Sequence, residues 1–298
     1  MSLVVNNNMM AANTARTLNQ HYGRLAQSTQ RLSTGLRVNS AADDAAGLAI
    51  RELQRAEIAA LQQGARNAND AISLIQTADG ALGVIDEKLI RLKELAEQAA
   101  TGTYDSTQRL MIESEYQAMA SEITRIANAT DFNGIYLLNG NLSSDEHNGS
   151  GMVSTGKLKI HFGSSNYSAE DYYYITIGDC TASALGVGNQ ADPDTAKAYT
   201  VSTQEAAQHA LEGITQAIVS KDKIRAHLGA MQNRLENTIT NLNVQAENLQ
   251  AAESRISDVD VATEMTEFVR NQILTQSAVA MLSQANSLPQ MAMQLIGG

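Results

Sequence analysis

The chain has 298 residues, enough to bury a substantial core, and a formal net charge of −11 at pH 7. The acidic balance argues against a general nucleic-acid-binding protein, and the absence of tryptophan with only three phenylalanines argues against a thick globular core. The single cysteine, Cys180, excludes an internal disulfide.

The first expected helix has a leucine at every seventh position, at Leu18, Leu25 and Leu32. Gly35 is expected to end it. Ser40 and Asp43 have the spacing of a capping box, so a second helix is expected to start at Ser40. Its apolar 3–4 spacing continues, with one three-residue slip, to about residue 100, which predicts an unusually long helix.

The middle of the chain changes character. Gly102 is expected to interrupt the helical pattern, and Asp105 to cap a third helix. Asn-Gly dipeptides at 133–134 and 139–140 predict turns, and residues 157–162 and 172–178 predict a β-hairpin. The stretch 179–200 is small, polar and irregular, with a turn expected at Asp192-Pro193.

Helix is expected to resume at Ser202, with Glu205 completing a second capping box. The clearest heptad seam of the chain follows, at Leu228, Leu235, Leu242, Leu249 and Ile256. Ser257 and Asp260 form a third capping box, which predicts a last helix from about Val261 to the region of Pro289.

These patterns predict a mainly α fold, in which long helices from both chain ends form a coiled-coil-like bundle with a small β-hairpin region in the middle. Residues 41–130 and 202–256 can close as a bundle within one chain. Residues 1–40 and 258–298 are thin in large apolar side chains, and ordering each residue costs about 1–2 kcal/mol of backbone entropy. We therefore expect this terminal pair to fold against copies of the same chain. When each copy uses one surface to bind a different surface of the next, and the copies do not form a closed ring, the result is an open helical filament.

No candidate catalytic residue, cofactor site or metal site emerges. The histidines are scattered without ligand spacing, at His21, His147, His161, His209 and His227. No glycine-rich phosphate loop follows a predicted strand, and Cys180 has no basic neighbour in sequence, which favours a buried or idle thiol. The uncharged stretch after Arg270 is too polar for a membrane span.

Four segments carry a family resemblance. They are RLSTGLRVNSAADDAAGLAI (31–50), ARNANDAISLIQTADGAL (65–82), LGAMQNRLENTITNLNVQAENLQAAESRISDVDVATE (228–264) and NQILTQSAVAMLSQANSLPQMAMQLI (271–296). In this order they resemble the conserved blocks at the two ends of bacterial flagellins. Long ordered matches at both ends are far more specific than a short motif, whereas the middle of the chain is not diagnostic.

The resemblance implies a structural subunit that self-assembles into the helical bacterial flagellar filament used for swimming motility, and no enzymatic activity. Residues 1–40 plus 258–298 then correspond to inner-tube terminal helices. Residues 41–178 plus 202–257 correspond to the outer-tube bundle with its β-hairpin, and residues 179–201 to a short variable surface excursion. Such proteins are extracellular and are exported without a cleaved signal peptide, and the first ten residues have no secretory signal pattern.

The implied partners are copies of the chain itself, the flagellar type III export apparatus and its chaperone, the filament cap and hook-junction proteins, and host flagellin receptors. Nucleic acid and membrane are not among them. The positions that match the family's receptor-recognition surface are Arg91, Leu95 and Glu115, although ordinary solvated helix charges would also explain Arg91 and Glu115. Leu288 and Leu295 lie in the terminal region that resembles the one sensed by cytosolic receptors.

Three other functions stay open from the sequence. One is the hook–filament junction protein of the flagellum, whose ends resemble flagellin. Another is a soluble coiled-coil scaffold that forms a closed dimer inside the cell. An enzyme is the weakest alternative, because no catalytic constellation supports it. The long C-terminal match and the small middle region favour the filament subunit.

Overall fold

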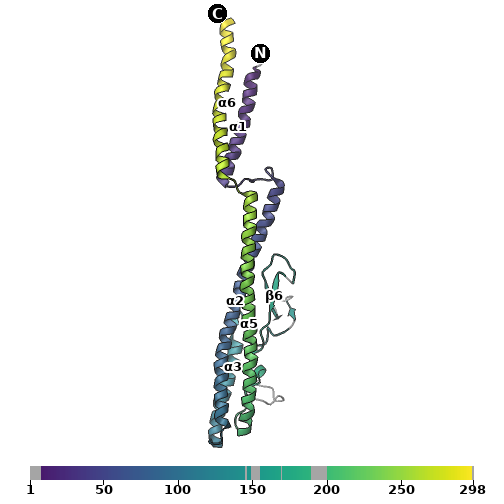
Figure 1. The fold of residues 1–298 in the computed structure, drawn as a ribbon, viewed down its shortest axis with the longest axis vertical. Helices are drawn as coiled ribbons and strands as arrows, with labels where there is room; N and C mark the ends of the chain where they lie inside the picture. The colour runs from purple at the N-terminus through teal and green to yellow at the C-terminus, as the bar shows by residue number, and fades with distance from the viewer. Residues whose placement is uncertain (1–7, 145, 149–154, 169, 189–199, 297–298) are drawn as a thin grey trace. The chain divides into compact units, whose positions relative to one another are not determined.

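The computed structural model describes residues 8–144, 146–148, 155–168, 170–188 and 200–296. It confirms the mainly α fold, with long helices from both chain ends and short strands in the middle (Figure 1). The helices are α1 (Met9–Thr34), α2 (Ala45–Ala100), α3 (Ser106–Ala129), α4 (Ala182–Leu185), α5 (Gln204–Ser257) and α6 (Val261–Ile296). The strands are β1 (Asp131–Phe132), β2 (Ile135–Tyr136), β3 (His147–Asn148), β4 (Thr155–Gly156), β5 (Leu158–His161) and β6 (Tyr172–Ile175).

The chain divides into two compact units. The terminal unit consists of residues 1–58 and 247–298, and the central unit of residues 59–246. The first boundary lies within α2 and the second within α5, and both helices continue through the boundary without interruption. The assignment of the chain's ends to an inner tube, with limits at residues 40 and 258, remains a prediction.

In the terminal unit, α1 and α6 lie side by side along their length (Figure 1). Gly35 ends α1 with φ +73°, a left-handed conformation that costs glycine little, so this prediction is confirmed. The next residues pair with the start of the C-terminal segment, where Val259 donates its N–H to the carbonyl of Gly35 at 3.0 Å. The two ends of the chain are therefore joined by backbone hydrogen bonds as well as by helix packing.

The predicted start of the second helix is wrong by five residues. The carboxylate of Asp43 accepts both the N–H and the hydroxyl of Ser40, at 3.0 and 3.1 Å. Only one half of a capping box forms, because the Ser40 hydroxyl donates to Asp43 instead of accepting a backbone N–H, and residues 40–43 form a turn. Asp44 caps α2 instead, since its carboxylate accepts the N–H of Gly47 at 2.8 Å.

The capping box at Ser202 also places a helix start too early. At α5 the hydroxyl of Ser202 accepts a hydrogen bond from Thr200, which leaves Thr203 to accept the N–H of Ala206 at 3.2 Å. The predicted start of the last helix at about Val261 is confirmed, but Ser257 still belongs to α5 and Asp260 caps α6 directly. The prediction at Asp105 is confirmed, with a complete capping box at the start of α3.

The last helix does not end near Pro289, as expected, but continues to Ile296. Proline has no N–H, so the carbonyl of Ala285, four residues earlier, lacks its partner within the helix. The side-chain amide of Asn8 donates to that carbonyl at 2.8 Å. This hydrogen bond offsets part of the free-energy penalty of placing Pro289 inside a helix, which is consistent with α6 continuing beyond that residue.

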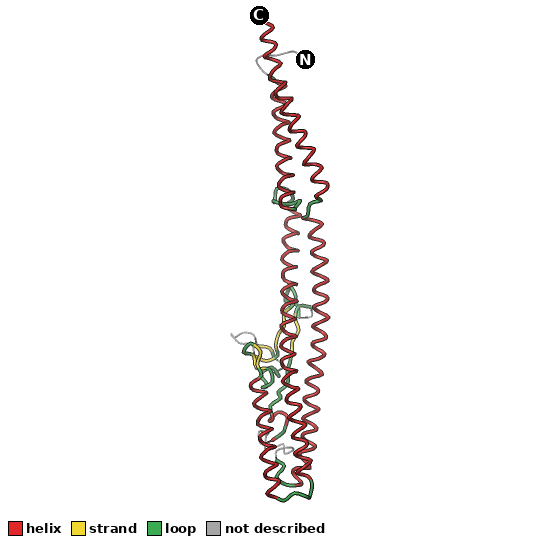
Figure 2. Tube along the Cα trace, turned by 90° about the vertical axis from the view of Figure 1, so that its left-hand side faces the viewer, coloured by secondary structure: helices red, strands yellow, loops and turns green. Residues whose placement is uncertain are grey.

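The central unit is a helical bundle in which α2, α3 and α5 run alongside one another (Figure 2). Its core consists of fully buried apolar side chains from all three helices, among them Leu82, Ile85, Leu89, Ile123, Leu228 and Leu235. Each such side chain contributes roughly 1.5–3 kcal/mol when it leaves water. Because the packed helices belong to one chain, this unit holds a core of its own.

The predicted hairpin is confirmed as β5 and β6, paired antiparallel with Ile160 opposite Tyr173. The turn at Asn133-Gly134 is also confirmed, since both residues have positive φ, 52° and 80°, between β1 and β2. The short β3–β4 pair and α4 were not expected from the sequence. The turn predicted at Asp192-Pro193 lies outside the described residues.

The hairpin sits directly on α2. Asn67 donates its side-chain amide to the carbonyl of His161 at 2.9 Å. A Cβ atom on Gly64 would lie only 1.9 Å from the carbonyl oxygen of Phe162, so the hairpin backbone approaches the helix too closely for any other residue. Glycine at this position is what lets the hairpin dock.

Candidate assembly interface

Helix α6 exposes its large apolar side chains. Those exposed along its length are Val261, Met265, Val269, Ile273, Leu274, Val279, Met281 and Met291. The side chains of α6 that are buried in the terminal unit are instead small or polar, namely Asn271, Thr275 and Ala285. Large apolar side chains of a helix normally face a core, yet α1 is the helix that packs along α6 here, and these side chains remain exposed. The exposed apolar face therefore has the character of an interface.

Helix α1 buries only part of the apolar surface of the α1–α6 pair. Its predicted seam residues Leu18, Leu25 and Leu32 are each half-buried, and Ser28 is the buried residue of the helix. One ion pair joins the two helices, between Arg31 and Glu264 at 3.5 Å. Such a pair contributes little by itself when it is partly solvated. The α1–α6 pair thus buries few large apolar side chains by itself.

The predicted seam of α5 differs along its length. Leu228, Leu235 and Leu242 are buried in the central unit, whereas Leu249 and Ile256 in the terminal unit are half-buried. The seam is therefore satisfied within one chain only in the central unit. The residues at its other end keep apolar surface available for further packing.

The structure brings two of the three predicted recognition residues together. The guanidinium of Arg91 donates to one carboxylate oxygen of Glu115 through Nε and Nη2, at 3.0 and 2.7 Å, and to Glu94 at 2.9 Å. The hydrogen bonds that Arg91 donates to Glu115, and then to Glu94, raise the pKa of its guanidinium group. Leu95 is only 1% exposed and packs in the core, so it lies beneath this surface instead of on it.

The residues predicted for recognition of the terminal region, Leu288 and Leu295, lie in α6. Leu288 is half-buried, and Leu295 belongs to the same helix, but its side chain is outside the described residues. Glu94 completes the Arg91 cluster and was missed, although its position three residues along the helix is a typical ion-pair spacing.

A buried cation links α2 and α5, and nothing in the sequence pattern pointed to it. The side chain of Lys221 is 2% exposed and pairs with Asp86 on α2 and with Asp222, the latter at 2.8 Å. One turn away, Arg225 pairs with Asp79 at 2.7 Å in a more exposed site. Asp79 and Asp86 are seven residues apart on α2, and Lys221 and Arg225 are four residues apart on α5. Because the later aspartate pairs with the earlier cation, both ion pairs are compatible with a single antiparallel alignment of the two helices.

No group of His, Cys, Asp or Glu side chains in the described part of the chain could hold a metal ion. Cys180 is fully buried, and burial, followed by the nearby charge of Asp179, raises the pKa of its thiol to about 12. A protonated buried thiol is a poor nucleophile. None of the described helices is both long enough and apolar enough to cross a membrane.

Comparisons with known proteins agree at the level of family. Residues 5–143 match the bacterial flagellin N-terminal helical region, and residues 211–296 match the bacterial flagellin C-terminal helical region. The chain is 41% identical to a flagellin of Bacillus subtilis (strain 168) over 308 residues, covering 98% of this chain and 99% of the relative. It is 39% identical to flagellin FlaB2 of Treponema pallidum (strain Nichols) over 294 residues, covering 99% of this chain and all of the relative.

The fold also resembles a solved structure from Vibrio parahaemolyticus that is named for a flagellar hook-associated protein. The TM-score is 0.55 and the sequence identity 14%, with 72% of this chain and all of that chain covered. At this identity the likeness concerns the fold alone.

Proposed function

Because the chain belongs to the bacterial flagellin family, we infer that it is a structural subunit of the bacterial flagellar filament. Full-length relatives and both terminal family matches support this function. The subunit polymerises with copies of itself, and the filament lies outside the cell. Flagellins are structural proteins, and we propose that this chain likewise has no catalytic activity.

The observation that carries self-assembly is the exposed apolar face of α6. Among the described side chains of this helix, eight large apolar ones are solvent-exposed while Asn271 and Thr275 are buried. Exposed apolar surface of this extent is costly in a lone subunit and is removed when copies pack together. A face that meets a different face of the next copy propagates as an open helix, which is the symmetry of a filament.

We propose that residues 1–40 and 258–298 form the inner tube of the filament and that residues 41–178 and 202–257 form the outer tube. The separate core of the central unit supports this division, because it needs no neighbour to be buried. The half-buried seam of α1 supports it as well, because that helix lacks a full set of partners in the subunit. Residues 179–201, predicted as a surface excursion, are then anchored in the outer tube, because Cys180, Val187 and Val201 are buried in its core.

We propose that the chain passes through the flagellar type III export apparatus with a dedicated chaperone, without a cleaved signal, and meets the filament cap and hook-junction proteins on assembly. Membership in the flagellin family supports these partners. A subunit whose terminal helices need neighbours for burial also suits transport as an unfolded chain.

We propose that the surface formed by Arg91 and Glu115 is recognised by host flagellin receptors, with the buried Leu95 supporting it from below. Both charged side chains are nearly half-exposed and fix one another through two hydrogen bonds. A receptor-reporter assay on monomer tests this, with Arg91→Ala plus Glu115→Ala expected to lose most signalling. Arg125→Ala, which breaks a comparable exposed pair with Glu122, should signal normally.

The assembly function is tested by polymerising the purified chain on filament seeds and imaging it by negative-stain electron microscopy. A matched chain that lacks residues 1–40 and 258–298 is the control. Long filaments from the full chain alone support the proposal. Closed oligomers from both chains would instead favour a coiled-coil scaffold or a hook-junction protein.

A further inference from the structure

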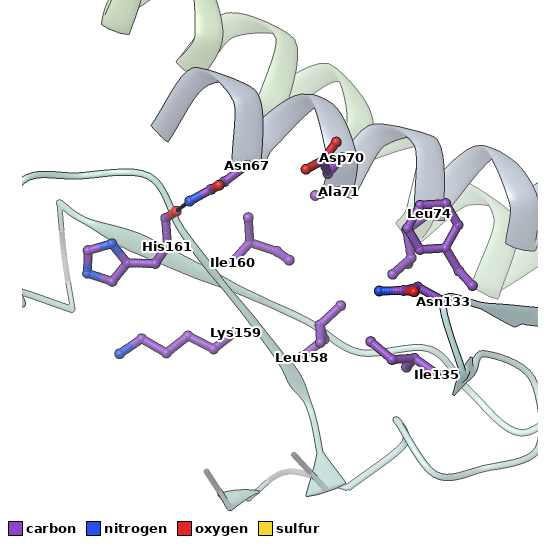
Figure 3. A pocket seen from close by; sticks show the side chains of 11 residues that line it. Asn67, Asp70, Ala71, Leu74, Asn133, Ile135, Leu158, Lys159, Ile160 and His161 are labelled. Atoms are coloured by element: carbon purple, nitrogen blue, oxygen red, sulfur yellow. Dashed lines mark hydrogen bonds between the residues drawn. The ribbon is translucent and has the colours of Figure 1, made fainter. Parts of the chain in front are cut away.

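The β5–β6 hairpin has two faces of different chemistry. Its inner face lines a cleft of about 600 Å³, in which Leu158 and Ile160 lie opposite Leu74 of α2 (Figure 3). Because side chains alternate along a strand, Lys159 and His161 belong to the outer face, and Figure 3 shows both side chains pointing away from Leu74. The outer face is therefore not used for packing on α2.

Cationic side chains and aromatic rings alternate on this outer face. The ammonium of Lys157 lies 4.5 Å from the ring centroid of Tyr174, and the ammonium of Lys159 lies 3.7 Å from the ring centroid of Tyr172. The ring of His161 stacks on that of Tyr172, with their centroids 6.0 Å apart. We refer to this row as the cationic ladder, which consists of Lys157, Tyr174, Lys159, Tyr172 and His161.

The cationic ladder holds its two ammonium groups in defined positions. Each lysine is fixed over a tyrosine ring, and Lys159 also donates a hydrogen bond to Oδ1 of Asn166 at 3.3 Å. Lys157 and Lys159 are two residues apart on one face of a strand, so their backbone attachment points are about 6.6 Å apart. A ligand that pairs with both lysines therefore costs little further side-chain entropy.

The charge of the cationic ladder is opposite to that of the chain. The net charge is −11, yet neither β5 nor β6 contains an acidic residue. Asp171, immediately before β6, is only 8% exposed, and its carboxylate accepts the N–H of Tyr167 at 2.7 Å. Among the described residues, the exposed acids nearest to these strands in sequence are Glu146 and Glu170, which lie outside both strands. A polyanion is therefore attracted to this face and repelled by most of the remaining surface.

The tyrosine rings of the cationic ladder already have partners within the chain. His161 stacks on Tyr172, and His147 of β3 contacts Tyr174 with ring centroids 5.6 Å apart, in addition to the two lysines. Single-stranded nucleic acids are bound on open aromatic faces, where their bases stack. The ladder instead offers fixed charges without free rings, which suits a linear polymer whose charges are carboxylate or sulfate groups.

We propose that the cationic ladder binds a linear acidic polysaccharide, with the ammonium groups of Lys157 and Lys159 paired to carboxylate or sulfate groups along the sugar chain. This binding function goes beyond filament assembly and does not depend on it, because the hairpin belongs to the central unit, which has a core of its own. The full chain therefore binds the polysaccharide as a monomer.

Titration calorimetry of the monomeric full chain with a heparin-derived octasaccharide at low salt tests the proposal. Lys157→Ala plus Lys159→Ala should weaken binding by at least about tenfold, because two charge-assisted hydrogen bonds are lost. Lys93→Ala plus Lys223→Ala removes the same charge from exposed positions of α2 and α5 and should change the affinity far less. Maltooctaose, an uncharged chain of equal length, should not bind.

Three results would overturn the proposal. They are no binding of the octasaccharide, equal losses of affinity in the two double variants, and tighter binding of a single-stranded oligonucleotide of equal charge. The rings are tested separately, since Tyr172→Phe plus Tyr174→Phe keeps both ring faces and should bind normally. Leucine at both positions keeps every charge but frees the lysines, so it should bind several-fold more weakly, and unchanged affinity would contradict a ladder that fixes them.

A second measurement does not depend on the folding of any variant. The unsubstituted chain is acetylated with an N-hydroxysuccinimide ester, with and without the octasaccharide, and each modified lysine is identified by mass spectrometry. The octasaccharide should protect Lys157 and Lys159 and leave Lys93 and Lys223 reactive. Equal protection of all four lysines, or none at the ladder, would contradict the proposed site. The filament function is untouched by either outcome, because it is tested by polymerisation.

Discussion

The side-chain amide of Asn8 donates a hydrogen bond to the carbonyl of Ala285, 277 positions away, at 2.8 Å. The same Asn8 side chain accepts the N–H of Ala11 and caps α1. One residue thus satisfies an orphan N–H at the start of α1 and the carbonyl that Pro289 leaves unpaired in α6. It fixes the alignment of the first helix against the last.

This double role predicts non-additive substitutions. Asn8→Ser keeps a capping oxygen but loses the amide donor, so filaments should lose about 1 kcal/mol of stability. In a Pro289→Ala background the helix supplies its own N–H to Ala285, and Asn8→Ser should cost much less. The depolymerisation temperature, followed by light scattering, measures both. An equal loss in the two backgrounds would rule out the proposed link to Pro289.

Two glycines of α2 predict opposite effects of the same substitution. Gly64→Ala places a Cβ 1.9 Å from the carbonyl oxygen of Phe162, so the hairpin must move and the Asn67 hydrogen bond weakens, at a cost of about 1–3 kcal/mol. Gly80→Ala meets nothing within 4 Å and should stabilise the helix by about 0.4–1 kcal/mol. Urea unfolding of the two variants measures the difference. A stabilising Gly64→Ala would show that the hairpin does not require this close approach.

The buried cation predicts a large difference between two aspartates of α2. Asp86→Asn leaves the ammonium of Lys221 buried with Asp222 alone and should cost about 2–3 kcal/mol. Asp79→Asn breaks a pair whose side chains are 37% and 46% exposed, which should cost less than about 1 kcal/mol. Thermal unfolding of the full chain compares them. If the two variants lost similar amounts of unfolding free energy, burial of Lys221 would not strengthen its contribution to stability.

Cys180 predicts a loss of stability in alkali. Burial raises the pKa of its thiol to about 12 from an ordinary value near 9.0, so the folded chain holds a proton that the unfolded chain releases. This contribution is complete below pH 9 and declines as the pH rises from 9 toward 12, by about 1 kcal/mol between pH 9 and 10. Cys180→Ala should remove that part of the slope in urea titrations. The two chains should otherwise lose stability in parallel, and an unchanged slope in the variant would exclude the thiol as its source.

The sequence predicted which helices exist better than where they begin. The pairs Ser40 and Asp43, and Ser202 and Glu205, have capping-box spacing, yet their helices start later, at Ala45 and Gln204. The last helix does start at Val261, as predicted, although Asp260 caps it and not Ser257. A side chain can bond to a neighbouring residue in a turn as readily as to a helix N–H, and spacing does not distinguish the two. Gly35 and Asp105 were placed correctly because a left-handed glycine and a complete box leave fewer alternatives.

The candidate surfaces were harder to predict. Helix α6 has apolar and polar side chains on every side and no single apolar stripe, so periodicity could not show that Asn271 and Thr275 would be buried and Met265 exposed. The Lys221–Asp86 pair spans 135 positions and depends on the register of two helices, which no local pattern specifies. Leu95 was identified by position in a matching segment, and only packing reveals that it lies in the core.

The central claim is that the exposed apolar face of α6 is buried by neighbouring subunits, and amide hydrogen exchange across α6 in monomer and in filaments tests it most directly. The account predicts that residues 261–291 exchange readily in the monomer and become strongly protected in the filament, while core positions such as Leu82 and Ile85 are protected in both. Equal protection of residues 261–291 in monomer and filament would contradict it.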